Sequence, residues 1–185
     1  SRPVIGVFAL KSFLNIFDDG TGTESIRKGI KRMRKMCIDA GVGDPYILSN
    51  ESTGSNIIKL ASEAGLDGIT AYGLGDDATF ATQRINMLST AEECKSAGID
   101  FWPIATPMRN DIAWRIYSGY THSGEEFSEH LAWIKNNITD KQSPSVSKKV
   151  VNMTTWDEYG EGHIIAPTVG LGFEYLDAIR ENYVK

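Results

Sequence analysis

The sequence is short of several features that mark large classes of protein. No apolar run approaches the ~20 residues that cross a bilayer, so no membrane span is predicted. Cationic residues are outnumbered, with 19 Lys and Arg against 24 Asp and Glu, which gives a net charge of −5. A broad phosphate-binding surface is therefore not expected, and nucleic acid is not predicted as a partner.

Motifs for cofactors are lacking as well. Cys37 and Cys94 fall in helical stretches with no CxxC neighbour and no nearby histidine, so they are interpreted as buried thiols rather than metal ligands. The loop after the first apolar stretch contains Gly20 and Gly22, but it has neither a G-x-G-x-x-G motif nor a Walker lysine. The sequence thus predicts no metal and no cofactor.

Short β-rich stretches and helical periodicity alternate along the chain instead. The composition, with 41% hydrophobic and 23% charged residues, is that of a globular protein that buries a core. No linker divides the 185 residues, which fit one domain or part of a larger one. Strands are predicted at 2–10, 45–50, 67–73, 100–108 and 148–156, and helices at 25–41, 56–65, 77–98, 123–138 and 172–184.

Five strand–helix repeats predict an α/β fold with a parallel sheet whose strands are adjacent in chain order. The segments "EAGLDGIT" and "SAGIDFWPI" support this prediction, since each ends a helix on glycine and enters a strand two residues later. Two architectures stay open: a doubly wound sheet, and most of a (β/α)8 TIM barrel. In both, ligands bind at the C-terminal ends of the strands.

The residues at those strand ends are aromatic, acidic, amide or arginine side chains. Aromatic faces stack on sugar rings, while carboxylates and amides form hydrogen bonds with vicinal hydroxyls, so the mixture favours a carbohydrate. The predicted substrate-binding residues are Asn50, Glu51, Tyr72, Trp102, Arg109, Asp111, Trp156, Asp157 and Tyr159.

The segment "TTWDEYGEGHIIAP" (154–167) follows the last predicted strand and is rich in carboxylates. Glycoside hydrolysis commonly uses one protonated and one ionised carboxyl group. Glu158 and Glu161 suit these roles, because the glycines near them allow a tight turn. Burial beside Trp156 and Tyr159 is expected to raise the pKa of one carboxyl. The alternative is a solvated acidic turn.

The stretch "VVNMTTWDEYGEGHIIAPT" is similar to the W-N-E-W-x-E-G-x-x-x-x-P signature of glycoside hydrolase family 99 and its larger, endo-α-mannosidase-related group. That group includes proteins assigned to polysaccharide biosynthesis as glycosyltransferases. "RPVIGVFAL", "AGLDGITAYG", "FWPIATPMRND" and "FSEHLAWIKNN" follow the group's order and approximate spacing. The resemblance implies a (β/α)8 barrel, of which residues 1–185 form a single domain corresponding to the C-terminal five βα units.

The resemblance also implies roles for the two glutamates. Glu158 matches the base that acts on the sugar 2-hydroxyl to give a 1,2-anhydro intermediate with net retention. Glu161 matches the general acid that protonates the leaving oxygen and later activates water. Asp157, Tyr159 and Gly160 depart from the family's Asn, Trp and bulkier residue, which puts substrate identity in doubt.

We therefore expect a glycoside hydrolase that acts on an α-linked glycan or polysaccharide. A glycosyltransferase of surface-polysaccharide synthesis and a non-catalytic glycan-binding domain on the same fold are the alternatives. An upstream barrel half is expected to cover the edge of the first strand, around Val4 to Phe8; without it, that edge is expected to self-associate. Residues 1–185 contain no signal-peptide pattern, and a secreted, periplasmic or lumenal location is favoured only by the glycan substrate.

Overall fold

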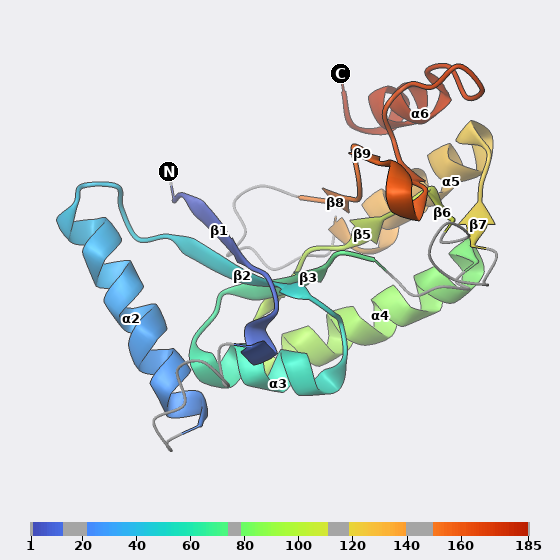
Figure 1. Ribbon diagram of the computed structural model, residues 1–185. Helices are drawn as coiled ribbons and strands as arrows, with labels where there is room; N and C mark the ends of the chain where they lie inside the picture. The colour runs from blue at the N-terminus through green and yellow to red at the C-terminus, as the bar shows by residue number, and fades with distance from the viewer. Residues whose placement is uncertain (1, 13–21, 74–78, 111–118, 140–149, 185) are drawn as a thin grey trace. The chain divides into compact units, whose positions relative to one another are not determined.

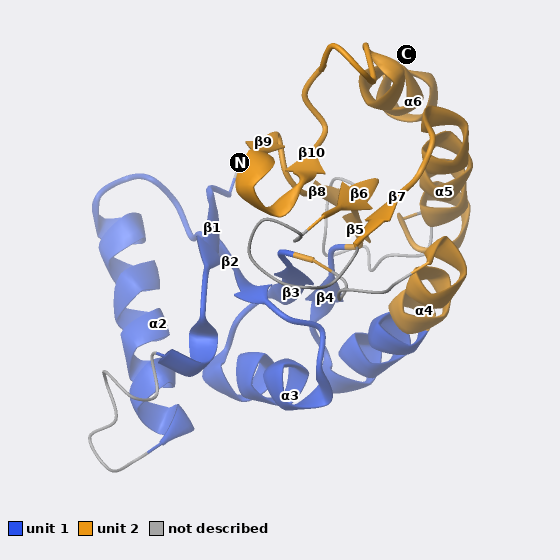
Figure 2. Cartoon of the chain, turned by 45° about the vertical axis from the view of Figure 1, so that its right-hand side comes forward, with its two compact units in different colours: residues 1–72, 89–102 blue, residues 73–88, 103–185 orange. Residues whose placement is uncertain are grey.

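The computed structural model of the chain describes residues 2–12, 22–73, 79–110, 119–139 and 150–184. These residues form two compact units (Figure 2). The first unit comprises residues 1–72 and 89–102, and the second comprises residues 73–88 and 103–185. The long helix α4 (Phe80–Ala97) contributes its first half to the second unit and its second half to the first.

The first unit is built on a four-stranded parallel sheet. Its strand order, β1-β2-β3-β4, follows the chain, and each neighbouring pair is parallel. This confirms the parallel α/β sheet predicted from the strand–helix repeats. Its elements are β1 (Val4–Val7), α2 (Thr23–Asp39), β2 (Tyr46–Glu51), α3 (Ser55–Ala64), β3 (Gly68–Ala71), the second half of α4, and β4 (Asp100–Phe101).

One face of this sheet is apolar and is covered by helices. Val7, Ile47 and Ile69 lie on that face and are buried. Burying a side chain of this size contributes roughly 1.5–3 kcal/mol. Figures 1 and 2 show α2 and α3 on the same side of the sheet, whereas a doubly wound sheet carries helices on both faces. On the opposite face, Val4 and Phe8 are exposed.

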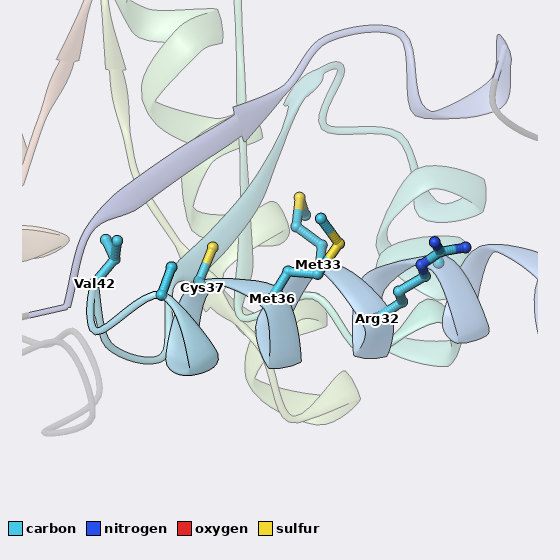
Figure 3. A pocket seen from close by; sticks show the side chains of 7 residues that line it. Arg32, Met33, Met36, Cys37 and Val42 are labelled. Carbon is cyan, nitrogen blue, oxygen red and sulfur yellow. The ribbon is translucent and has the colours of Figure 1, made fainter.

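Helix α2 uses only half of its apolar stripe to pack in the core. The stripe consists of Ile26, Ile30, Met33 and Cys37. Ile26 and Ile30 are buried, whereas Met33 is only half-buried, and Met36 beside the stripe is 60% exposed. The second half of the stripe borders an open groove of about 340 Å³ (Figure 3). Cys37 lies in this groove and is only half-buried, so its interpretation as a buried thiol is wrong. Cys94 is fully buried as predicted, and burial raises the pKa of its thiol to about 12.

The second unit combines one parallel strand pair with two hairpins and a helix pair. β5 and β8 are parallel, whereas the pairs β6–β7 and β9–β10 are antiparallel. Apart from the first half of α4, its elements are β5 (Ile104–Ala105), β6 (Met108–Arg109), β7 (Tyr120–Thr121), α5 (Gly124–Asn137), β8 (Asn152–Met153), β9 (Asp157–Glu158), the 3-10 turn η3 (Tyr159–Glu161), β10 (His163–Ile164) and α6 (Glu174–Tyr183).

The strand predicted at 100–108 is three short strands. Pro103 separates β4 from β5, and Pro107 separates β5 from β6. Proline has no N–H to donate to a ladder, so a continuous strand through both positions is disfavoured. Each piece finds a different partner: β3, β8 and β7 respectively. Of the strand predicted at 148–156, β8 is the paired part, and residues 148–149 lie outside the described residues.

Helices α5 and α6 pack against each other. Ser123 is followed three residues later by Glu126, a spacing that predicts a capping box at the start of α5. The structure has this box: the side chains of Ser123 and Glu126 each accept the other's backbone N–H. The Gly124 N–H donates to Glu174 Oε2 at 2.8 Å, which joins the start of α5 to α6. Within the described residues, no helix has both the length and the apolarity needed to cross a membrane.

Candidate active site

Both predicted catalytic glutamates lie on the hairpin that follows the parallel strand β8. Glu158 ends β9, and Glu161 ends the 3-10 turn between β9 and β10. Gly162 then adopts a left-handed conformation with φ 58°, which a glycine accepts without strain. The chain reverses here, and His163 pairs with Glu158 in the hairpin ladder. The turn predicted between the two carboxylates is therefore present.

A threonine ties this hairpin together at its base. Thr155 Oγ1 donates to the His163 carbonyl at 2.6 Å and accepts the Glu158 N–H at 3.3 Å. The peptide bond between Thr154 and Thr155 is cis. These contacts fix the main chain at Glu158, and no sequence signal points to Thr155, because its role depends on hairpin geometry.

The aromatic residues of the hairpin face solvent. Trp156 is 58% exposed and Tyr159 is 62% exposed, while Glu158 and Glu161 are half-buried. The expectation that these two rings bury a carboxyl group is therefore not met, because both rings turn outward. Exposed rings of this kind are able to stack on a ligand.

The hairpin of β6 and β7 brings Arg109 to the same turn. The Arg109 side chain is 16% exposed, and its Nη2 lies 4.0 Å from Glu161 Oε2. The adjacent Asn110 N–H donates to the Glu161 carbonyl at 2.8 Å. Asn110 was not predicted as a site residue, although it stands beside Arg109 in "PMRND". Asp111 lies outside the described residues.

Asn50, Glu51 and Tyr72 stand at strand ends of the first unit. Asn50 and Glu51 end β2, and Tyr72 follows β3 directly. Glu51 Oε2 accepts the Lys11 N–H at 3.1 Å, which ties the segment after β1 to β2. The ring of Tyr72 lies edge-on to that of Phe8, with centroids 6.4 Å apart. All three residues thus lie at the C-terminal ends of strands, as predicted from the sequence.

Trp102 follows β4 and stacks on Tyr46, with ring centroids 5.5 Å apart. The Tyr46 hydroxyl donates to Asp100 Oδ2 at 2.9 Å in a buried setting. Burial, together with the Asp100 carboxylate, raises the pKa of Tyr46 far above its usual value. The stacked ring of Trp102 therefore already has a packing role within the first unit.

The predicted site residues fall into two groups. The first unit holds Asn50, Glu51, Tyr72 and Trp102. The second unit brings Arg109 together with the hairpin of Glu158 and Glu161. That the two groups line one cleft stays a prediction. In the described ranges, no three His, Cys, Asp or Glu residues are grouped so as to hold a metal ion.

Comparison with solved structures shows proteins that share this fold. A structure of the GH99 endo-α-mannosidase from Bacteroides thetaiotaomicron matches 99% of this chain and 53% of its own length, with a TM-score of 0.58 and 14% identity. A structure of the same enzyme in complex with bis-tris propane matches 76% of this chain and 46% of its own length, with a TM-score of 0.51 and 16% identity. The chain thus spans about half the length of these structures and shares their fold. No protein-family model and no curated protein matches the sequence.

Proposed function

We propose that this chain forms part of a (β/α)8-type glycoside hydrolase of the family-99-like group, and that it cleaves an α-linked glycan. The observation that carries the proposal is the position of the two glutamates. Both lie on a hairpin directly after a parallel strand, in a fold shared with two endo-α-mannosidase structures. In barrels of this type, the loops at the C-terminal ends of the strands hold the active site.

The chemistry assigned to the hairpin uses both carboxyl groups. Glu158 acts as base on the sugar 2-hydroxyl, which attacks the anomeric carbon as the leaving oxygen departs. Glu161 donates a proton to that oxygen and then activates the water that opens the 1,2-anhydro intermediate. The exposed rings of Trp156 and Tyr159 offer stacking surfaces for neighbouring sugars. Asp157, Asp111 and the strand-end residues of the first unit are assigned to substrate hydroxyls.

Turnover without a sugar nucleotide tests the reaction type. The full-length protein should release reducing ends from α-mannan in buffer alone. Release that requires a sugar-nucleotide donor would make the protein a transferase. If calorimetry detects mannan binding but no reducing ends are released, the protein is a glycan-binding domain and not a hydrolase.

The leaving group separates the two glutamates. Glu161→Gln cannot donate a proton, so turnover of the glycan should fall by about 10²–10⁴-fold. A nitrophenyl glycoside of the same sugar needs no proton on its leaving group and should be affected much less. Glu158→Gln should slow both substrates, because its step forms the intermediate, and Asp157→Asn should stay active. If Glu161→Gln slows turnover of the glycan and of the nitrophenyl glycoside equally, Glu161 is not the general acid.

A further inference from the structure

The main chain at Glu161 is held by the hairpin of β6 and β7. The Asn110 N–H donates to the Glu161 carbonyl at 2.8 Å. Gly162 then packs tightly against Asn110: a Cβ at this position would lie 2.7 Å from Asn110 Cβ and 2.8 Å from its backbone nitrogen. Asn110 therefore fixes the turn on both sides of the Glu161 peptide.

The side chain of Glu161 meets the neighbouring residue of the same hairpin. Arg109 Nη2 lies 4.0 Å from Glu161 Oε2, and the Arg109 side chain is mostly buried. This distance exceeds that of a hydrogen bond, so the contact is electrostatic and does not take up the hydrogen-bonding capacity of the Glu161 carboxyl group. Arginine keeps its charge at any physiological pH and holds it on a rigid planar group. Two consecutive residues thus position both the backbone and the carboxylate of Glu161.

The hairpin that carries Arg109 is itself tightly built. Arg109 pairs with Tyr120, and Met108 pairs with Thr121. Gly119 lies so close to the Arg109 carbonyl that a Cβ at residue 119 would overlap it. Only glycine fits there, which brings β7 close to β6 and limits movement of the Arg109 backbone.

Glu158 is supported differently. Its N–H donates to Thr155 Oγ1, and it pairs with His163 in the β9–β10 ladder. The two glutamates are close in sequence, but one is anchored within its own hairpin and the other by a separate hairpin. Separate anchoring suits two carboxyl groups that perform different steps, because each is oriented independently.

We propose that Arg109 is a positioning residue that orients the Glu161 carboxylate, rather than a residue that binds substrate. The inference rests on the proposed function, since Glu161 is the group to be oriented. It makes two separable claims: Arg109 and Glu161 interact energetically, and this interaction affects the chemical step more than substrate binding.

A double-mutant cycle tests the first claim without any substrate. Arg109→Met and Glu161→Gln are made singly and together in the full-length protein, and thermal unfolding is measured. The decreases in Tm of the two single variants, added together, should exceed the decrease in Tm of the double variant by about 1–3 °C. Arg180 and Asp177 form an exposed pair at 2.9 Å, and the same cycle there should give under about 1 °C. Additive losses at Arg109 and Glu161 would overturn the proposal.

Kinetics on α-mannan tests the second claim. Arg109→Met should lower kcat about tenfold and leave KM within about twofold, and Arg109→Lys should recover part of kcat by restoring the charge. A raised KM with unchanged kcat would show that Arg109 binds substrate, which contradicts the proposal. If the wild type lacks turnover, the proposed function fails, while the unfolding cycle still decides whether Arg109 holds Glu161.

Discussion

The two units differ in how many donors surround their carboxylates. In the first unit, Asp67 precedes β3 and accepts from Arg34 Nη2 at 2.6 Å, the Ile47 N–H at 2.8 Å and Arg2 Nη2 at 2.9 Å. In the second unit, the Glu161 side chain is 37% exposed and has Arg109 at 4.0 Å. A carboxylate enclosed by three donors stabilises the fold, whereas one on an exposed hairpin is available to a ligand.

Their buried polar groups differ as well. The second unit encloses the neutral imidazole of His130, which stacks on Phe80 with centroids 4.0 Å apart and accepts from Arg84 Nε at 3.4 Å. Burial, with the charges of Arg84 and His122, lowers the pKa of His130 to about 3. The first unit relies on an ionised group and the second on a neutral one, so acid should act on the two units in different pH ranges.

The largest effect is expected from acidification of the second unit. His130 has a folded pKa below its unfolded value near 6.5, so the unfolded chain takes up a proton first as the pH falls. Stability should therefore decline from about pH 6.5 towards pH 3, by roughly 3–5 kcal/mol in total. His130→Gln removes this titration, and urea unfolding between pH 7.5 and 4 should show a flatter pH dependence. An unchanged slope would mean that His130 is not held neutral.

A glycine in the hairpin should give the next effect. Gly162→Ala places a Cβ at a positive φ and against Asn110, which should cost about 2–4 kcal/mol. Gly170 has a free environment, with no atom within 4 Å of a Cβ, so Gly170→Ala is the matched control and should stay within about 0.5 kcal/mol. Equal unfolding midpoints in urea would show that the turn is not clamped by Asn110.

Asp67 provides the corresponding test in the first unit. Burial opposes its ionisation, but the Ile47 N–H and the guanidinium groups of Arg34 and Arg2 outweigh it and lower the pKa of Asp67. Its contribution is complete above the unfolded pKa near 4 and is lost as the pH falls through the folded pKa. Asp67→Asn should cost about 2 kcal/mol at pH 7 and less near pH 2. A cost that persists unchanged at pH 2, measured by thermal unfolding, would contradict this.

The smallest effect is expected on the outer half of α2. Met36 is 60% exposed, so Met36→Gln should change stability by under about 0.5 kcal/mol. Ile30 is 5% exposed in the same helix, and Ile30→Ala should cost about 2–4 kcal/mol. If chemical denaturation shows similar decreases in the free energy of unfolding for Met36→Gln and Ile30→Ala, the groove side of α2 is packed in solution.

Prediction from sequence succeeded where the signal was local. The capping box at Ser123 and the helix predicted at 123–138 were both confirmed, since each depends on residues within one or two helical turns. The strand at 100–108 failed, because hydrophobic character alone did not show that Pro103 and Pro107 would divide it among three partners. The prediction that Cys37 is buried was wrong for a similar reason, because an apolar stripe on a helix does not show how far the segment packed against it extends.

The sequence by itself determined the alternation of strands and helices and the turn between Glu158 and Glu161. These features follow from side-chain periodicity and from glycine's access to a left-handed backbone, which act over a few residues. Only the tertiary structure placed Arg109 beside Glu161 and turned Trp156 to solvent. Those outcomes depend on which distant segments pack together, and local periodicity carries no information about that choice.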